Sequence, residues 1–469
     1  MPTEERQTTL NIDLERETFT TLGGRNLMET KLKRIAELAN ERPDIKFTSL
    51  VHLLNEVNLK RCHQELPAGK ATGINGVTKV EYGEDLDENI ARLVEKLKRK
   101  SYRPIPVRRT YIAKPGTKMK RPLGIPEHED KIVQRGIAKI LNAIYEPIFL
   151  DCSFGFRPNR NCHDALKILN VYIEERHTNY IVDVDIKGFF DNVSHEWMMK
   201  FLEHKIADRN LLRIIGRFLK GGYMEEGKYY KTDVGTPQGG IISPILANIY
   251  LHYVLDLWFE KVVRKSCIGQ AYMVRYADDF VCCFQSETEA NKFYRDLVVR
   301  LRKFNLEISE DKTKIIPFGK YAGKNAKRRG DKKPETFDFL GFTHFVSQSK
   351  YGKFRVKRKT SGKKMRAKLK ECKEWLIKHR NMKIHDIVDR IRRSLTGYFN
   401  YYCITDNTRS VRKFVEKIKG LFFKWMNRRS QRKSFNYEKF QLFIKKFPFP
   451  TPRVKVNIYS LRSEIKYIL

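Results

Sequence analysis

Hydrophobic and polar positions form different patterns in successive parts of the chain. Residues 1–45 are mainly polar, and a loose arm is expected there. From about residue 47, apolar residues recur close to helical spacing, which predicts a helix with one buried face. The apolar positions of this stretch are Leu50, Leu53, Leu54, Val57 and Leu59.

Strand-like and helix-like segments alternate between residues 100 and 320. Three runs rich in β-branched and aromatic residues predict strands, because such side chains suit a pleated, half-buried surface. The three runs are 180–186, 271–276 and 280–284.

Acidic residues stand out in these strand-like runs. A period of two places Ile181, Asp183 and Asp185 on one face of the first run and only apolar residues on the other. Asp278 and Asp279 lie side by side between the other two runs, which costs stability unless a cation is bound. If these strands are neighbours, three carboxylates converge, as two divalent metal ions would require. An ordinary hairpin tip is the alternative interpretation.

The balance of charge indicates a polyanionic partner. The length of 469 residues allows two to four folded units, and the apolar content of 41% is enough for normal cores. They include 93 Lys or Arg and 55 Asp or Glu, a net charge of +38. Basic side chains gain most when they displace the counterions of a nucleic acid. A ribosomal or generic RNA-binding protein would have the same balance, so only a catalytic site can separate these classes.

Basic residues are concentrated after residue 318. Residues 320–334 contain seven Lys or Arg and one Asp, and residues 350–380 contain fourteen Lys or Arg and two Glu. Aromatic residues such as Trp375 and Trp425 are interleaved with them. This combination is typical of a nucleic-acid groove, and solvated surface is the alternative.

The eight cysteines include no C-x-x-C unit, so they are expected to be reduced core thiols rather than zinc ligands. No apolar run is long enough for a membrane span, and the N-terminus lacks the pattern of a signal peptide. A cytoplasmic protein without membrane contact is expected.

Ordered motifs extend over about residues 45–440. They are GKATGINGVT (69–78), YIAKPGTKMKRPLGIP (111–126), SFGFRPNRNCHDAL (153–166), DIKGFFDNV (185–193), GTPQGGIISPILANIYL (235–251), RYADDF (275–280), LEISEDKTKI (306–315), FDFLGF (337–342), SLTGYFNYY (394–402) and KWMNRRSQRKS (424–434). In this order the chain resembles the reverse transcriptases encoded by group II introns.

The resemblance implies an α+β fold shaped like a right hand, with fingers, a palm containing an antiparallel sheet, and an α-helical thumb or domain X. The expected parts are a polar arm (1–45), an N-terminal extension (46–100), fingers and palm (101–320), the palm end with a primer grip and basic linker (321–345), and the helical thumb (346–469).

The resemblance also implies roles for residues inside the matching motifs. Two Mg²⁺ ions, for which Mn²⁺ could substitute, are expected at the metal ligands Asp185, Ile186, Asp278 and Asp279. Lys312 is expected either to donate a proton to the leaving pyrophosphate or to be a surface lysine. Asp183 lies outside the match and is expected to support the site.

Further residues are expected to bind substrates. Those expected at the dNTP are Lys114, Arg121, Phe190 and Gln238. Phe190 would crowd the sugar 2′ position and exclude ribonucleotides, with a core position as its alternative. Residues expected at nucleic acid are Arg157, Arg160, Lys357, Arg358, Lys359, Lys363, Lys364, Arg428 and Arg429.

The predicted function is therefore RNA-directed DNA synthesis. The expected partners are group II intron RNA or another structured RNA template, a DNA primer or target, and dNTPs, with assistance to intron splicing and retrohoming. A homodimer and a bacterial source are compatible with the sequence. The alternatives are a domesticated relative in DNA repair, phage defence or CRISPR spacer acquisition, and a splicing-only maturase, which the three matching carboxylates disfavour.

Two departures from the family pattern are present. Asn75 stands where the family often has Asp, which puts only a local turn in doubt. The chain ends about 35 residues after the last motif without paired cysteines. A zinc-linked DNA endonuclease domain is therefore not expected.

Overall fold

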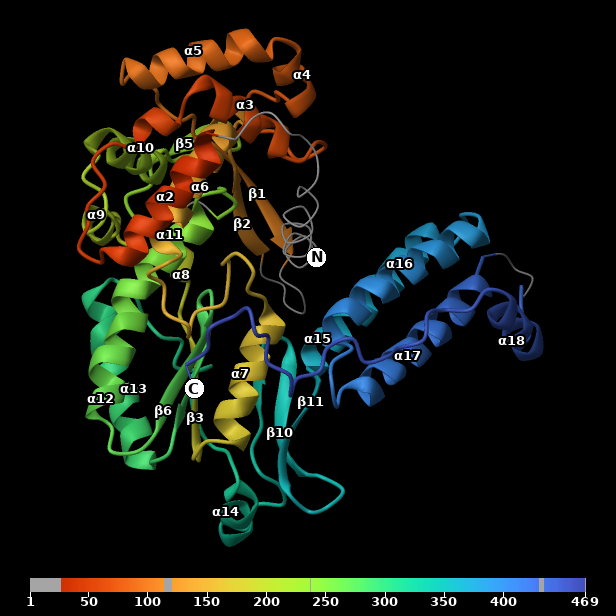
Figure 1. Ribbon diagram of the computed structural model, residues 1–469. Coiled ribbons are helices and arrows are strands. Elements are labelled where there is room, and N and C mark those ends of the chain that lie inside the picture. The colour runs from red at the N-terminus through yellow and green to blue at the C-terminus, as the bar shows by residue number, and fades with distance from the viewer. Residues whose placement is uncertain (1–26, 114–119, 237, 430–433, 469) are drawn as a thin grey trace.

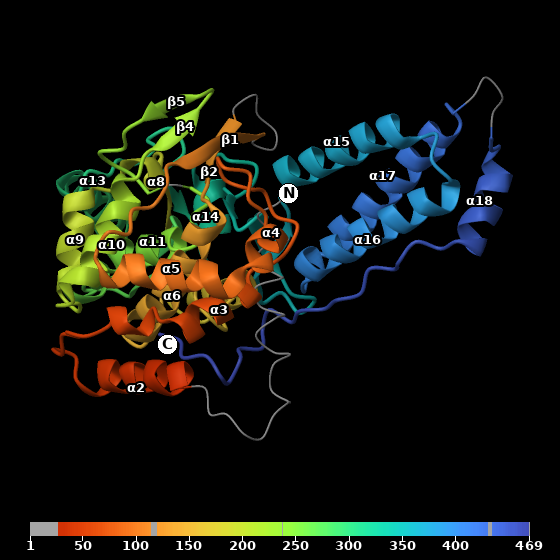
Figure 2. The same cartoon turned by 90° about the horizontal axis from the view of Figure 1, so that it is seen from above.

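The computed structural model describes residues 27–113, 120–236, 238–429 and 434–468 (Figure 1). It consists of a body built around β-sheets and a group of C-terminal helices that projects from one side, as two perpendicular views show (Figures 1 and 2). Lys114 and the first 26 residues of the expected arm lie outside the described residues.

Helices cover the N-terminal end of the body. They are α2 (Leu27–Glu41), η1 (Val51–Leu53), α3 (Glu56–Glu65), α4 (Lys79–Glu84), α5 (Leu86–Lys98) and α6 (His128–Tyr145). In α5 the buried residues Ile90, Leu93, Val94 and Leu97 recur at helical spacing and form its inner face.

The structure corrects two expectations in this region. The second half of the expected loose arm is helix α2, which packs against α6 and buries Ala39. The helix expected from residue 47 is divided into η1 and α3. Four of its predicted apolar positions are buried: Leu50, Leu53, Leu54 and Leu59. Val57 is 75% exposed, because it lies on the outer side of α3.

Two four-stranded sheets form the centre of the body. The first has the order β2-β1-β4-β5 and contains β1 (Val107–Ala113), β2 (Lys120–Ile125), β4 (Tyr223–Glu225) and β5 (Lys228–Tyr230). The second has the order β6-β7-β3-β8 and is antiparallel throughout. Its strands are β3 (Tyr180–Asp185), β6 (Ala271–Tyr276), β7 (Asp279–Phe284) and β8 (Lys314–Pro317). The three predicted strands are thereby confirmed.

The antiparallel sheet separates two hydrophobic cores. Val182 and Phe280 face the core that contains α11 (Ser243–Leu251) and α13 (Glu287–Lys303). Ile181 and Val281 face the other core, which contains α7 (Cys162–Glu174) and continues into the C-terminal helices. The remaining elements of the body are α8 (Phe189–Asn192), α9 (His195–Glu203), α10 (Arg209–Lys220), the π-helical turns η2 (His252–Asp256) and η3 (Phe259–Val263), and α12 (Arg264–Ser266).

The region after residue 320 contains more regular structure than expected. The basic linker includes α14 (Ala322–Arg328), and β9 (Phe337–Phe339), β10 (Phe342–Gln348) and β11 (Phe354–Thr360) form a third sheet. The helical part therefore begins at residue 362 rather than 346. Its helices are α15 (Gly362–His379), α16 (Ile384–Tyr402), α17 (Thr408–Met426) and α18 (Tyr437–Lys446).

After α18 the chain returns to the body (Figure 2). The backbone N–H of Lys455 donates to the Cys403 carbonyl at 2.7 Å. Further along, Arg462 Nη1 donates to Asp164 Oδ2 at 3.3 Å, and the hydroxyl of Tyr172 donates to the Ile468 carbonyl at 2.5 Å. This segment therefore links the projecting helices to α7.

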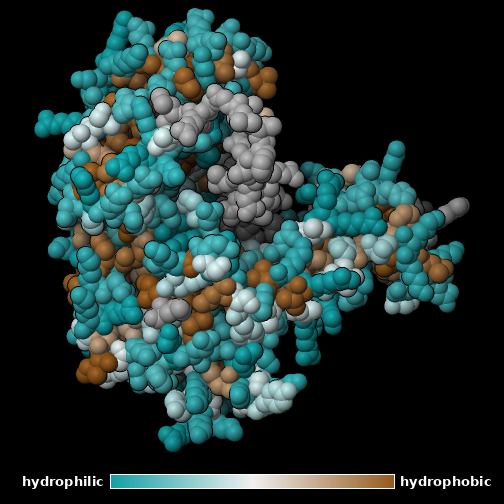
Figure 3. Space-filling model, viewed as in Figure 1, coloured by the Kyte–Doolittle hydropathy of each residue, from teal (hydrophilic) through white to brown (hydrophobic). Residues whose placement is uncertain are grey.

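All eight cysteines are free thiols; six are buried, as predicted, and Cys267 and Cys372 are half-buried. Among the described residues, none of the helices has the length and apolar character that a bilayer crossing demands. Hydrophilic residues cover most of the face in Figure 3, including the projecting helices.

Candidate active site

Strands β3 and β7 bring the predicted carboxylates together. In their antiparallel register Asp185 lies directly opposite Asp279, so both side chains share one face of the sheet. Asp183 lies on the same face, two residues before Asp185. Asp278 forms the two-residue turn between β6 and β7 together with Ala277. Ala277 has a φ of 58°, a conformation that is uncommon for residues with a Cβ and is often found at functional sites.

The crowding of these carboxylates disfavours their charged forms. The Asp279 side chain is exposed at the start of β7, and desolvation by the protein around its carboxylate, followed by the charges of Asp183, Asp278 and Asp185, raises its pKa above the ordinary value. Burial also raises the pKa of Asp278. Burial and neighbouring carboxylates raise the pKa of Asp183 to about 7. A bound cation would relieve this repulsion, which makes the cluster a candidate functional site.

Lys312 contacts one of the predicted metal ligands. Its Nζ donates to Asp185 Oδ2 at 2.5 Å, and the two side chains are 61% and 48% exposed. The backbone supports this position, because the N–H of Ser309 donates to the Asp185 carbonyl at 2.7 Å. The segment that carries Lys312 thus runs beside the end of β3, and its role as a proton donor stays a prediction.

The donor atoms of the cluster suit a hard divalent cation. Ile186 is 4% exposed with its side chain in the core, so only its carbonyl oxygen could serve as a ligand. In the described part of the chain, no three Asp, Glu, His or Cys side chains already surround one point as a bound ion requires. Lys312 also engages Asp185. These residues have the oxygen donors that a divalent ion needs, and the strand register places them on one face. Metal binding would require the carboxylate side chains to turn or Lys312 to move away from Asp185.

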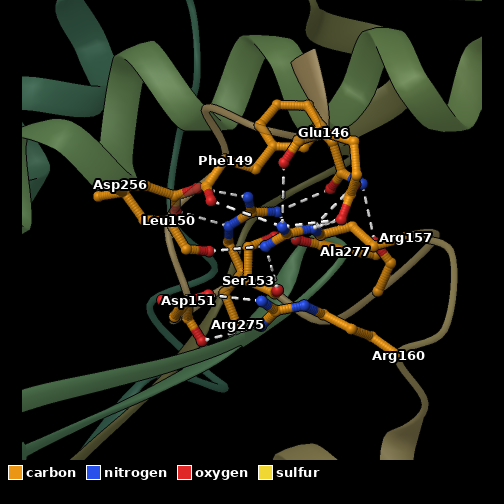
Figure 4. A network of polar contacts seen from close by, with 12 residues as sticks. Glu146, Phe149, Leu150, Asp151, Ser153, Arg157, Arg160, Asp256, Arg275 and Ala277 are labelled. Carbon is orange, nitrogen blue, oxygen red and sulfur yellow. Dashed lines mark hydrogen bonds and ion pairs between the residues drawn. The ribbon is translucent and has the colours of Figure 1, made fainter. Parts of the chain in front are cut away.

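A buried network lies beneath the turn between β6 and β7 (Figure 4). Arg275 is fully buried and donates to both carboxylate oxygens of Asp256, at 2.7 and 2.5 Å. Its Nη1 also donates to Asn248 Oδ1 at 3.0 Å and to the Ala277 carbonyl at 2.9 Å. Arg275 therefore fixes the turn that carries Asp278.

Sequence reasoning missed this network, because Arg275 is one basic residue among 93. The available signal was a charge inside an apolar strand run. Such a residue needs a buried partner, since an unpaired buried charge is very costly. Asp256 is that partner, and it lies in η2, which is also largely apolar.

A loop packs behind the same turn. The N–H of Phe154 donates to the Arg275 carbonyl at 2.8 Å. A Cβ added to Gly155 would lie 2.3 Å from the backbone nitrogen of Ala277, so only glycine permits this approach. The motif at 153–158 thus supports the carboxylate turn through its backbone.

Arg157, which was expected to bind nucleic acid, has an internal role instead. It is 5% exposed and lies among Glu146 and the carbonyls of its own loop (Figure 4). Its Nη1 donates to the Leu150 and Ser153 carbonyls at 2.7 and 2.9 Å. Arg160 is also largely internal, with a side chain that is 9% exposed and an Nη2 that lies 2.5 Å from Asp151 Oδ1.

Of the residues expected at the dNTP, Arg121 lies near the carboxylate turn and Gln238 lies between β2 and α8. Arg121 is exposed on β2, and its charge partly offsets the rise that burial causes in the pKa of Asp278. The Gln238 carbonyl accepts from the N–H of Gly124 on β2 at 2.6 Å, and Gln238 Nε2 donates to Asp191 Oδ1 at 3.4 Å. The segment around Gln238 therefore connects β2 with α8. Their binding roles stay predictions.

Phe190 lies on α8, just after the strand that carries Asp185. It is partly exposed, and its ring makes a T-shaped contact with Phe189 at a centroid distance of 5.2 Å. The Phe190 carbonyl accepts from the N–H of Thr236 at 2.8 Å. A Cβ on Gly235 would come within 3.0 Å of the same carbonyl. Phe190 thus packs at the edge of the core, beside the segment that contains Gln238.

The residues expected at nucleic acid in the C-terminal half are divided between surface and interior. Arg358 is fully buried, and its guanidinium donates to Asn170 Oδ1 and to the Val356 carbonyl, so the prediction for Arg358 is wrong. The other residues of this group are exposed or half-buried: Lys357, Lys359, Lys363, Lys364, Arg428 and Arg429. Strand alternation explains the difference, because Lys357 and Lys359 point to the opposite side of β11 from Arg358.

Two family models match the chain. A model described as "Reverse transcriptase (RNA-dependent DNA polymerase)" matches residues 112–344, which include both carboxylate strands. A second, described as "Group II intron, maturase-specific domain", matches residues 363–443, which include α16, α17 and all of α15 but its first residue.

Curated proteins are similar over long stretches. The "Group II intron-encoded protein LtrA" of Lactococcus lactis subsp. cremoris is 31% identical over 457 residues, which cover 82% of this chain and 75% of the relative. "Protein YkfC" of Escherichia coli is 28% identical and covers 69% of this chain and 90% of the relative. The "Putative COX1/OXI3 intron 1 protein" of Saccharomyces cerevisiae is 37% identical over 161 residues, 34% of this chain and 19% of the relative.

Proposed function

Because the chain belongs to the group II intron-encoded reverse transcriptase and maturase family, we propose that it copies RNA into DNA at the cluster of Asp185, Asp278 and Asp279. The observation that carries this proposal is the register of β3 and β7, which sets Asp185 directly opposite Asp279 beside the Asp278 turn. Phosphoryl transfer needs little more from a protein than such positioned charges.

The three sheets and the C-terminal helices support a right-hand arrangement. The antiparallel sheet β6-β7-β3-β8 would be the palm, and the sheet β2-β1-β4-β5 with its helices would be the fingers. Helices α15–α18 would be the thumb, held to the palm side by the C-terminal segment. A template–primer duplex would then lie between the fingers and the thumb, with the 3′ end of the primer at Asp185.

The reaction proposed is nucleotidyl transfer to a primer 3′-hydroxyl. Asp185, Asp278 and Asp279 would hold the divalent ions, and Arg121 would bind the triphosphate with its planar fork. When bound, the ions would acidify the hydroxyl and stabilise the departing pyrophosphate. Lys312, released from Asp185, would be close enough to give that pyrophosphate a proton. Arg275 would keep the turn in place throughout.

Metal removal tests this proposal. Incorporation of dNTPs along an RNA template should stop in excess EDTA and return when Mg²⁺ or Mn²⁺ is added in excess over the chelator, because the clustered carboxylates cannot perform the transfer alone. Radiolabelled incorporation on a homopolymer template with a DNA primer measures this directly. Synthesis that continues in EDTA would contradict the metal-dependent mechanism.

Phe190 provides a test of sugar selection. Phe190→Val should raise the use of ribonucleotides relative to deoxynucleotides by about 10- to 100-fold, because removing the ring opens space beside the 2′ position. The matched control is Phe189→Leu, which changes a neighbouring ring that is 2% exposed and faces the core. Single-nucleotide incorporation kinetics with dNTP and rNTP measure the ratio. An unchanged ratio of ribonucleotide to deoxynucleotide use in Phe190→Val would show that Phe190 only packs at the edge of the core.

The maturase-specific match favours a second role beside polymerisation. The protein would bind the structured RNA of a group II intron, assist its splicing, and use a DNA target as primer during retrohoming. The net charge of +38 supports binding through phosphates.

A further inference from the structure

The C-terminal segment follows the projecting helices back to the body. It leaves α18 and returns along α16 (Figure 2), and we call residues 447–468 the strap. At the far end of α16, the Phe447 ring makes a T-shaped contact with His385 at a centroid distance of 4.8 Å. Two turns further along the same helix, Arg392 Nε donates to the Pro448 carbonyl at 3.2 Å. The strap is therefore attached along the projecting helices before it reaches the body.

Backbone pairing holds the strap at the base of these helices. The N–H of Lys455 donates to the Cys403 carbonyl at 2.7 Å, and the N–H of Thr405 donates to the Val456 carbonyl at 3.1 Å. Ile458 of the strap is 1% exposed and joins the core between α7 and the C-terminal helices. The strap thus passes directly over the loop between α16 and α17.

The end of the strap is attached to the body. Arg462 Nη1 donates to the Asn159 carbonyl at 3.2 Å and to Asp164 Oδ2 at 3.3 Å. The hydroxyl of Tyr467 accepts from the backbone N–H of Arg462 at 3.3 Å, and its ring lies 6.4 Å from the ring of Phe154. These contacts join the strap to the loop that packs behind the carboxylate turn and to the first turn of α7.

The projecting helices also contact the body directly, and these contacts lie at their base. Asn407 Nδ2 donates to Thr360 Oγ1 at 2.9 Å, and the Tyr401 hydroxyl donates to the Leu340 carbonyl at 2.9 Å. From this base α16 extends for 19 residues, or roughly 28 Å. A small rotation at the base would therefore move the far end of the helices by a large distance. The strap crosses this joint and is fixed on both sides of it.

We propose that the strap positions the projecting helices relative to the carboxylate cluster, and that its attachment through Arg462 determines how long a template–primer stays bound during synthesis. Arg462 is a positioning residue, because it contacts the loop behind the turn and acts through the strap. The role of the template–primer rests on the proposed polymerase function.

Arg462→Glu releases the body end of the strap. It removes both hydrogen bonds of the guanidinium and sets a second carboxylate beside Asp164, whose side chain is 1% exposed. The matched control is Arg453→Glu, since Arg453 is an exposed arginine of the same strap and the two variants change the net charge equally. Arg462→Lys keeps the positive charge and should largely preserve the behaviour of the wild type.

Cys403 reports the attachment of the strap without any substrate. This thiol is 2% exposed at the point where the strap pairs with the backbone. Alkylation by iodoacetamide, followed by mass spectrometry of the peptides, measures the rate at each cysteine. Arg462→Glu should raise the rate at Cys403 about tenfold, because losing hydrogen bonds to a charged group favours local opening. The rate at Cys62, which is fully buried in the body, should not change, and Arg453→Glu should change neither rate.

Primer extension in the presence of a heparin trap measures the number of nucleotides added in one binding event. Arg462→Glu should shorten these products at least about threefold relative to Arg453→Glu, because faster dissociation ends each event earlier. Insertion of the first nucleotide by pre-bound complexes should change little, because Arg275 still holds the carboxylate turn. A misfolded fraction of the protein would lower the amount of product but not its length.

Three results would overturn the proposal. The first is an unchanged rate of alkylation at Cys403 in Arg462→Glu. The second is a rise at Cys403 and Cys62 together, which would show a general loss of stability. The third is equal product length in Arg462→Glu and Arg453→Glu, which would show that the strap only packs.

Failure of the polymerase proposal would be recognised separately. A wild-type chain that makes no DNA would refute the proposed reaction, and the release of a labelled RNA–DNA duplex would then decide on the strap. Faster release from Arg462→Glu than from Arg453→Glu would support the positioning role, and equal release would contradict it.

Discussion

Arg275→Met should lower the free energy of unfolding by about 3–5 kcal/mol. Arg275 and Asp256 are fully buried, and the guanidinium also donates hydrogen bonds to Asn248 Oδ1 and to the Ala277 carbonyl. Methionine retains much of the volume but leaves Asp256 as an uncompensated buried charge, which is the main source of the loss. Urea denaturation followed by circular dichroism measures the change.

Two further variants show whether the buried charge is responsible. Arg92→Met removes an arginine from an exposed, 3.8 Å pair with Glu88 and should change stability by less than about 0.5 kcal/mol. The double variant Arg275→Met, Asp256→Leu removes both charges and should recover much of the stability. A double variant as unstable as Arg275→Met alone would show that shape, rather than an unpaired carboxylate, dominates.

Asp279→Asn and Asp185→Asn should each reduce the rate of RNA-templated DNA synthesis by at least about 1000-fold. Asparagine keeps the size of the side chain but removes the charge that would hold a divalent ion. Because Asp185 and Asp279 lie directly opposite each other in the sheet, either substitution removes one carboxylate from the same metal-binding cluster. Single-turnover extension at saturating dNTP measures the chemical step, and RNA affinity should be unchanged.

Asp183→Asn is the matched comparison for these two variants. Asp183 lies on the same face but opposite Val281, two residues further from the turn than Asp185. Replacing Asp183 should therefore reduce the rate of DNA synthesis much less than Asp279→Asn or Asp185→Asn does. A loss as large as that of Asp279→Asn would make Asp183 a metal ligand and would change the assignment of the site.

The sequence was sufficient to predict the central elements of the candidate site. A period of two identified the acidic face of β3, and the short apolar runs on either side of Asp278 and Asp279 predicted the two strands that form the hairpin. Local patterns decide such features, because the register of a hairpin follows from its turn. The resemblance to a known family added the order of motifs that local patterns cannot supply.

The errors arose where tertiary contacts decide the outcome. Arg358 lies in a basic run that looks exposed, yet strand alternation turns it toward Asn170. Arg275 pairs with the buried Asp256, and Arg157 pairs with Glu146 and with carbonyls of its own loop, which a basic residue in the sequence does not reveal. Helix α2 was missed because its sequence is mostly polar, and its packing against α6 supplies the stability that propensity does not.

Primer extension along an RNA template tests the central claim most directly. The wild-type chain is compared with the Asp278→Ala, Asp279→Ala double variant in Mg²⁺ and dNTPs, and RNA binding is measured for both. The account predicts extension by the wild type alone, with equal RNA affinity. An inactive wild type that still binds RNA tightly would contradict it and would favour a protein that assists splicing without copying RNA.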